Sequence, residues 1–234
     1  MIAMRPRDER GRTRISWLDS RHSFSFGDYF DPQNMGFRSL RVINEDVVAP
    51  GGGFGTHGHR DMEILSYVLE GGLRHQDSSG GGGVIRPGEI QFMRAGRGVT
   101  HSEHNASSTE PVHFLQIWIV PDQAGLDPTY GQNTFDAQEA AHGFELLASR
   151  DGREGSLRLQ QDADLLVAHL APGESRDRAI AAGRHVWLQV ARGELSLDGQ
   201  RLRAGDGAAL TREPGVSLRA QGDEGAEVLL FDLA

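Results

Sequence analysis

The sequence contains two copies of one glycine-punctuated pattern, and this internal repeat restricts the fold more than any other feature. The segment around Gly71 (LEGGL) resembles that around Gly193 (ARGEL), and the segment around Gly88 (IRPGE) resembles that around Gly205 (LRAGD). The paired glycines are 122 and 117 residues apart, and the glycine-rich hairpin tip at 78–83 (SSGGGG) can absorb the difference. Repetition at this separation indicates two structural units of the same fold.

Short strands joined by tight turns account for most of the remaining pattern. The 234 residues include 31 glycines, which cluster between short segments of alternating or branched apolar residues. This arrangement is typical of all-β proteins, and Asp198-Gly199 is a two-residue hairpin signal. No helical periodicity precedes Pro121. We therefore predict an all-β fold with strands at 37–48, 63–69, 73–77, 89–93, 112–120, 165–170, 186–191, 195–197 and 228–233.

A change in composition marks the boundary between the two units. Residues 122–133 are rich in Asp, Gly, Pro and Asn, as linkers commonly are. We place the first domain, with this linker, at residues 1–133 and the second at residues 134–234. A chain of this length accommodates two domains of ordinary size.

Two histidine-containing stretches in the first unit predict a metal centre. His57 and His59 are two residues apart after a glycine-rich turn, and His101 and Glu103 repeat this spacing. Because side chains at i and i+2 of a strand leave the same face, each pair can present two donors together. Imidazole and carboxylate donors suit iron, copper, nickel, manganese or zinc. Three histidines and one carboxylate also leave coordination positions open, as a catalytic metal site requires.

Two glutamates compete for the carboxylate position in this centre. Glu63 follows His59 by four residues, so on one uninterrupted strand it would share a face with both histidines and with Asp61. Glu103 lies in the His-x-Glu segment and suits the same role. We expect one glutamate to bind the metal and the other to support a ligand through a hydrogen bond.

The second unit lacks these donors. At the repeat offsets, the four candidate ligands correspond to Ala179, Ala181, Leu218 and Ala220. We therefore expect a copy of the fold without the metal site. Two other histidines, His22 and His104, could approach the site in the first unit. The histidines that we otherwise expect to be structural or superficial are His22, His75, His104, His113, His142, His169 and His185.

Charge and composition exclude several classes of protein. The net charge of −9 argues against general affinity for nucleic acid, although residues 4–14 hold five arginines that we interpret as a solvated arm. The apolar run at 114–120 is far shorter than a bilayer span of ~20 residues. The charged N-terminus has no apolar segment, so no secretory signal is expected. The absence of cysteine excludes disulfides and thiolate chemistry, and we expect a cytoplasmic protein.

The same segments resemble a known family. Gly51, His57, His59 and Glu63 are spaced as in the first cupin motif, and the stretch from Gly88 onward resembles the second. More specifically, residues 12–135 resemble the pirin family. The matching segments are HSFSFGDYFDP, MGFRSLRVINEDVVAPGGGFGTHGHRDMEILSYVLEGGLRHQDS, IRPGEIQFMRAGRGVTHSEHN, EPVHFLQIWIVP and GLDPTYGQNTF.

The resemblance implies a bicupin, with two β-sandwich barrels and a metal only in the N-terminal one. It implies that His57, His59, His101 and Glu103 are the ligands, and that Glu63 is not. It also implies one divalent ion, with Fe(II) first and nickel, copper, manganese, zinc or cobalt as alternatives. One departure from the family is Gly58, where pirins usually have proline between the two histidines.

Bacterial pirins similar to this chain act as quercetin dioxygenases, which open the flavonol heterocycle with dioxygen and release carbon monoxide. The resemblance therefore implies an oxidoreductase with a flavonol and dioxygen as substrates, and Glu103 is our candidate general base. The alternative comes from animal pirins, which are described as iron-dependent co-regulators that bind transcription factors. On that alternative the chain is a non-catalytic module with a protein partner.

Overall fold

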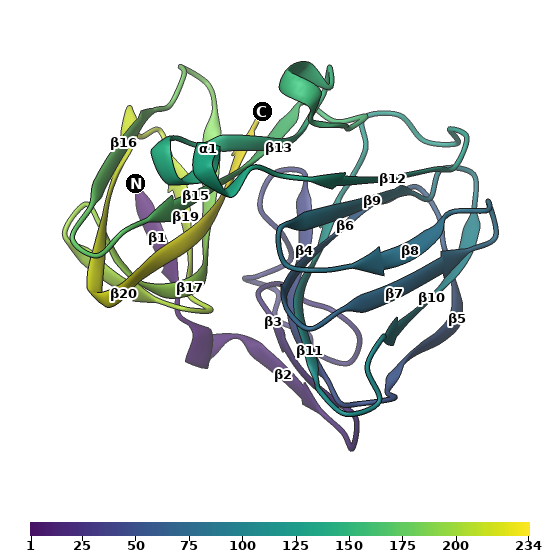
Figure 1. Cartoon of the computed structure of the whole chain (residues 1–234). Coiled ribbons are helices and arrows are strands. Elements are labelled where there is room, and N and C mark those ends of the chain that lie inside the picture. The colour runs from purple at the N-terminus through teal and green to yellow at the C-terminus, as the bar shows by residue number, and fades with distance from the viewer. The chain divides into compact units, whose positions relative to one another are not determined.

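The computed structural model comprises two compact units, and it describes residues 1–234 apart from the side chains of residues 137 and 138. Both units consist almost entirely of antiparallel strands (Figure 1). The prediction of an all-β fold is confirmed, and the domain limits at 1–133 and 134–234 remain a prediction. The first unit is formed by Gly11–Phe135 and Leu159–Gln161, and the second by Met1–Arg10, Asp136–Arg158 and Asp162–Ala234.

The first unit is a sandwich of two sheets. The larger sheet has the order β12-β9-β6-β11-β4-β3-β2, and the smaller has the order β5-β10-β7-β8 (Figure 1). The strands of the larger sheet are β2 (Gly11–Arg14), β3 (Leu18–His22), β4 (Leu40–Val48), β6 (Glu63–Glu70), β9 (Glu89–Arg94), β11 (Val112–Ile119) and β12 (Thr129–Thr134). Those of the smaller sheet are β5 (Gly53–His59), β7 (Leu73–Asp77), β8 (Gly82–Ile85) and β10 (Val99–Asn105).

The interior of this sandwich is layered. One apolar cluster includes Val68 and Phe114, and a second includes Ile64 with Trp118 packed against it. Along β6 and β11 the residues between these positions on the same face are Ser66 and Gln116, because strand side chains alternate. A polar layer therefore lies between two apolar ones.

The second unit has a nine-stranded sheet along the path β1-β19-β17-β20-β15-β13-β14, with β16 on β20 and β18 on β17. Its strands are β1 (Ile2–Arg5), β13 (Glu145–Ser149), β14 (Leu157–Arg158), β15 (Ala163–Leu170), β16 (Ser175–Ala179), β17 (His185–Leu197), β18 (Gln200–Arg203), β19 (Gly207–Thr211) and β20 (Gly215–Leu233). The helical segments are α1 (Ala137–His142) and two short 3₁₀ turns, η1 (Arg7–Glu9) and η2 (Arg153–Gly155). None of the helices in the described structure is long and apolar enough to cross a membrane.

The repeat inferred from the sequence is visible in the strand pairing. β5 pairs with β10 in the first unit, and β16 pairs with the start of β20 in the second. A buried aliphatic cluster in the second unit contains Leu218 and Ala220, two of the positions that correspond to the expected ligands. The other two, Ala179 and Ala181, are exposed.

Two local expectations were wrong. Residues 122–133 were expected to be a linker, yet β12 begins at Thr129 and pairs with β9 over six residues, which satisfies that strand's free backbone groups. The arginine-rich N-terminus was expected to be a solvated arm, yet β1 pairs with β19 and the side chains of Arg5 and Arg10 are buried. Strand pairing with a distant partner overrides both composition signals.

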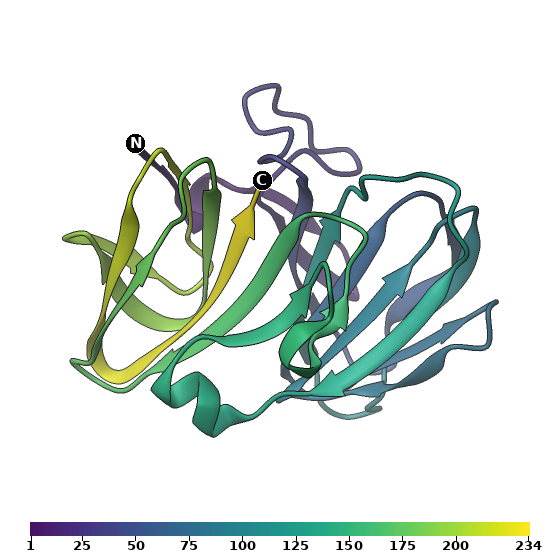
Figure 2. The same ribbon diagram turned by 90° about the horizontal axis from the view of Figure 1, so that it is seen from above.

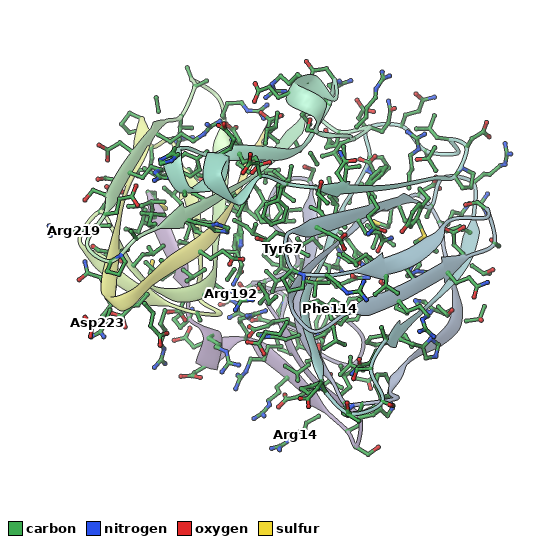
Figure 3. All side chains as sticks on the ribbon, viewed as in Figure 1. Arg14, Tyr67, Phe114, Arg192, Arg219 and Asp223 are labelled. Atoms are coloured by element: carbon green, nitrogen blue, oxygen red, sulfur yellow. The ribbon has the colours of Figure 1, made fainter. Side chains whose placement is uncertain are left out.

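The connection between β3 and β4 is a long loop, and side chains on the two units differ in exposure. Residues 23–39, which join β3 to β4, extend beyond the strands as a loop (Figure 2). Phe114 lies among the apolar side chains of the first unit, while Arg219 points outward from the second (Figure 3).

Candidate metal centre

The smaller sheet of the first unit holds three histidines side by side. His57 on β5 is directly opposite His101 on β10, and His59 is opposite Val99. The register shifts at a bulge between His101 and Glu103, so Glu103 is opposite Phe54. The period-two pattern predicted from the sequence therefore brings the histidines of two strands onto one surface.

The three imidazoles point their Nε2 atoms at one another. The Nε2 atom of His101 is 2.8 Å from that of His59 and 3.1 Å from that of His57. The ring centroids are 4.5–4.8 Å apart. His101 is buried, His59 is half-buried and His57 is partly exposed. Three nitrogen donors thus converge at a point that borders solvent.

The protonation of these rings suits a cation. Burial, with a smaller effect of the neighbouring imidazoles, lowers the pKa of His59 to about 4 and that of His101 to about 3. Both rings are therefore neutral at pH 7 and have a free lone pair. The Nδ1 atom of His57 lies 2.8 Å from the carbonyl oxygen of Gly55, so a proton on Nδ1 leaves Nε2 available. This donor set fits a divalent metal ion.

Glu103 adjoins this triangle without being part of it. A carboxylate oxygen of Glu103 lies within 4.8 Å of ring nitrogens of His101 and His75. His101 therefore belongs both to this group and to the triangle that it forms with His57 and His59. Gln116 Nε2 donates to its Oε2 at 3.0 Å, and Ser66 Oγ lies 3.2 Å from its Oε1. Burial raises the pKa of Glu103 to about 7, although both hydrogen bonds oppose the rise.

Glu63 does not share the face of the histidines, and that expectation was wrong. β5 ends at His59, and the chain turns at Asp61, which has a positive φ of 49°. β6 then begins in the other sheet, where alternation puts Glu63 on the face opposite Ser66. Its Oε1 accepts the backbone N–H of Gln160 at 2.7 Å.

A cavity of about 210 Å³ opens beside the triangle. His57, His59 and Glu103 lie in its wall, together with the aromatic rings of Trp118 and Phe54. Trp118 packs edge-on against His59, with the ring centroids 4.8 Å apart. The cavity is lined by Thr13, Leu18, Ser20, His22, Phe26, Gly27, Asp28, Asn44, Asp46, Phe54, His57, His59, Glu103, Gln116 and Trp118. A flat aromatic molecule with a few polar groups suits such a mixed wall.

His22 approaches the site, and His104 does not. His22 lines the cavity, with its Nδ1 2.8 Å from Asn44 Oδ1 and its Nε2 2.9 Å from Thr13 Oγ1. His104 is exposed on β10.

The sequence reasoning missed the side chains that surround the cluster. Ser66 and Gln116 hold Glu103, and His75 lies behind His101. The available signal was a polar residue at a core-facing position of an apolar strand, as in Ile64-x-Ser66-x-Val68.

A β-sandwich with a histidine cluster inside it, followed along the chain by a second all-β unit that repeats its β5–β10 pairing, defines a bicupin. In the described part of the second unit no such cluster of histidines and carboxylates occurs. The family models agree with this division. The model described as Pirin matches residues 3–119, and that described as Quercetinase C-terminal cupin domain matches residues 146–233. The chain belongs to the pirin family.

Full-length relatives share this architecture. Quercetin 2,3-dioxygenase of Escherichia coli strain K12 is 49% identical over 233 residues, which cover 100% of this chain and 99% of that protein. The crystal structure of YhhW from Escherichia coli superimposes with a TM-score of 0.95 at 49% identity, covering 100% of this chain and 98% of the other. A complex of the bacterial pirin YhhW with nickel(II) gives a TM-score of 0.93 at 48% identity, with 100% and 99% covered.

Proposed function

We propose that this protein is a metal-dependent dioxygenase that opens the heterocycle of a flavonol such as quercetin with dioxygen and releases carbon monoxide. The observation that carries the proposal is the convergence of three imidazole nitrogens at the wall of a partly aromatic cavity, with Glu103 beside them. The 49% identity to a quercetin 2,3-dioxygenase along the whole chain supports the same substrate class.

The proposed ligands are His57, His59, His101 and Glu103, which hold one divalent ion. A bound cation would act as a Lewis acid that stabilises the deprotonated flavonol. The nickel(II) complex of a relative supports a divalent ion, and Fe(II) remains our first expectation, with copper, manganese, zinc and cobalt as alternatives.

Glu103 is the proposed base for the flavonol 3-hydroxyl proton. Burial raises the pKa of Glu103 to about 7 in the metal-free protein, and a cation beside it would favour the ionised carboxylate that accepts a proton. Gln116 and Ser66 hold the carboxylate toward the cavity. The aromatic wall formed by Phe54 and Trp118 would pack against the substrate's rings and exclude water.

Activity and metal content test this proposal together. Purified protein is loaded with Fe(II) or Ni(II), and quercetin absorbance, dioxygen uptake and carbon monoxide release are followed. We expect His57→Ala to lose bound metal and turnover, and Glu103→Gln to lower kcat by about 10²–10⁴-fold. His113→Gln is the matched control, because His113 pairs with Glu45 in the same unit, away from the cavity lining.

Turnover that survives in both His57→Ala and Glu103→Gln would contradict the proposed site. Metal binding without any quercetin turnover would contradict the proposed reaction, and it would favour the alternative of an iron-dependent regulatory module with a protein partner.

A further inference from the structure

A fourth histidine lies behind the metal-site triangle. His75 on β7 is directly opposite Glu103 on the neighbouring strand β10, and its side chain is fully buried. Its Nδ1 is 3.3 Å from the Nδ1 of His101, and its Nε2 is 3.1 Å from Oδ2 of Asp77. The Asp77 side chain is also fully buried. A carboxylate, an imidazole and a candidate ligand thus form one continuous row.

In the row Asp77–His75–His101, the chemistry of the first and last members fixes which atoms donate and which accept. The Asp77 carboxylate can only accept, so His75 carries its proton on Nε2 and presents a bare Nδ1 to His101. At the other end, the Nε2 of His101 faces the Nε2 atoms of His57 and His59 and is the nitrogen that can bind a cation. The proton of His101 therefore resides on Nδ1 and points at His75. Gln91 Nε2, at 3.5 Å, is the other donor near that acceptor.

The glycine-rich hairpin tip accounts for the position of Asp77. Its Oδ1 accepts from the backbone N–H groups of Ser79 and Gly81, at 2.8 and 3.0 Å, and from Ser79 Oγ at 2.6 Å. A Cβ atom on Gly81 would come within 2.4 Å of Asp77 Oδ2 and 2.6 Å of the Tyr130 side chain. Tyr130 in turn stacks on His75, with ring centroids 5.2 Å apart. The absence of a side chain at Gly81 lets the carboxylate and the stacked rings close together.

We propose that Asp77 and His75 are positioning residues for the metal site: they hold His101 as the Nδ1-protonated tautomer and orient its Nε2 toward the cation. The inference rests on the metal site assigned under the proposed function, and it does not depend on the substrate. Outer partners of metal-binding histidines commonly contribute about 10–100-fold to metal affinity. His75 itself is not a ligand on this assignment, because both of its nitrogens are used by Asp77 and His101.

The test uses the full-length protein with metal alone. Apoprotein variants His75→Leu and His75→Gln are titrated with cobalt(II), and the ligand-field absorption reports affinity and coordination. The glutamine amide can accept from His101 and donate to Asp77, whereas leucine can do neither. We expect about 10–100-fold weaker binding for His75→Leu and near wild-type binding for His75→Gln. His113→Leu, which removes another histidine–carboxylate pair in the same unit, should bind like wild type.

Histidine ¹⁵N–¹H spectra of the zinc(II)-loaded wild type give a second readout that needs no variant to fold. We expect the proton of His101 on Nδ1, protected from solvent exchange. A proton on Nε2 of His101, or equal cobalt affinity in His75→Leu and wild type, would overturn the inference. An equal loss of cobalt affinity in His75→Leu and His75→Gln would also overturn it. In that case the hydrogen bonds that glutamine can replace would not be what supports the site. Wild-type protein that binds no cobalt would instead refute the metal site.

Discussion

Glu63 and Glu103 are both buried carboxyl groups in the first unit, yet their surroundings give them different roles. Burial raises the pKa of each to about 7. Glu103 faces the cavity and is held by Gln116 and Ser66. Glu63 lies on the other face of β6, where Gln160 donates to one oxygen and the other is buried without a partner. Of the two carboxyl groups, only Glu103 borders the cavity.

The raised pKa of Glu63 makes the stability of the metal-free protein depend on pH. The pKa of Glu63 rises from 4.5 to about 7 on folding, because burial disfavours the ionised carboxylate. The folded protein therefore has its full stability below pH 4.5, where Glu63 is protonated in both states, and loses part of it as pH rises through about 7. Glu63→Gln keeps the acceptor for Gln160 and removes the titration. We expect the variant to be ~1–3 kcal/mol more stable than wild type at pH 8 and nearly equal at pH 4.5. Urea unfolding of the apoprotein at both pH values measures this.

Metal content is the control for this variant. Glu63→Gln should bind metal like wild type, because Glu63 has no place among the proposed ligands. A lower metal affinity would restore Glu63 as a supporting residue, and a wild-type pH profile in the variant would contradict its raised pKa.

At the scale of elements, the approach of β5 to β10 sets the spacing between the two histidine-bearing strands. Gly53 permits this approach, because a Cβ atom there would lie 2.5 Å from the carbonyl oxygen of Glu103 and 2.6 Å from the Cα of His104. Two residues further along β5, a Cβ on Gly55 would meet nothing within 4 Å. In this glycine-rich segment, the close approach of the strands requires glycine at position 53, whereas position 55 has room for a side chain.

Alanine at Gly53 and at Gly55 should have different effects on stability and metal binding. We expect Gly53→Ala to lower the free energy of unfolding by about 1–3 kcal/mol and to weaken metal binding, since the strands must move apart. Gly55→Ala should be neutral or slightly stabilising, because its φ is not positive and the site is open. Thermal unfolding and cobalt titration check both, and similar behaviour of the two variants would contradict the close-approach argument.

At the scale of the whole molecule, the two cupin units differ in the chemistry of their interiors. The first has a polar layer of histidine, glutamate, serine and glutamine between apolar clusters. The buried residues of the apolar cluster described in the second are all aliphatic, and Leu218 is fully buried among them. Two units of one family thus hold a histidine cluster in one case and a packed aliphatic cluster at the corresponding strands in the other.

Substitution in the second unit should affect stability without affecting metal. Leu218→Ala is expected to cost about 2–5 kcal/mol, because it leaves a cavity in a packed core. Arg219→Ala, on the adjacent exposed position of β20, should change stability by less than about 0.5 kcal/mol. Denaturant unfolding measures the difference, and metal analysis of the folded Leu218→Ala protein should show unchanged stoichiometry. Loss of metal in that variant would indicate that the second unit contributes to the site.

Features that depend on spacing along one strand can be predicted from the amino-acid order alone. The period-two spacing of His57 and His59 was sufficient to predict that these two imidazoles share one face, because side chains alternate along a strand. His101 joins them through the pairing of β10 with β5. The internal repeat predicted two units of one fold, and the aliphatic residues at the repeat offsets predicted that the second would lack the cluster.

Features that depend on which strands become neighbours are set by the folded chain and could not be predicted from local spacing. The turn at Asp61 sends Glu63 into the other sheet, and the register of β7 against β10 brings His75 to His101. β1 likewise finds its partner in β19, about two hundred residues along the chain. Cross-strand contacts join residues far apart in sequence, and local periodicity carries no information about which distant strand will form the pair.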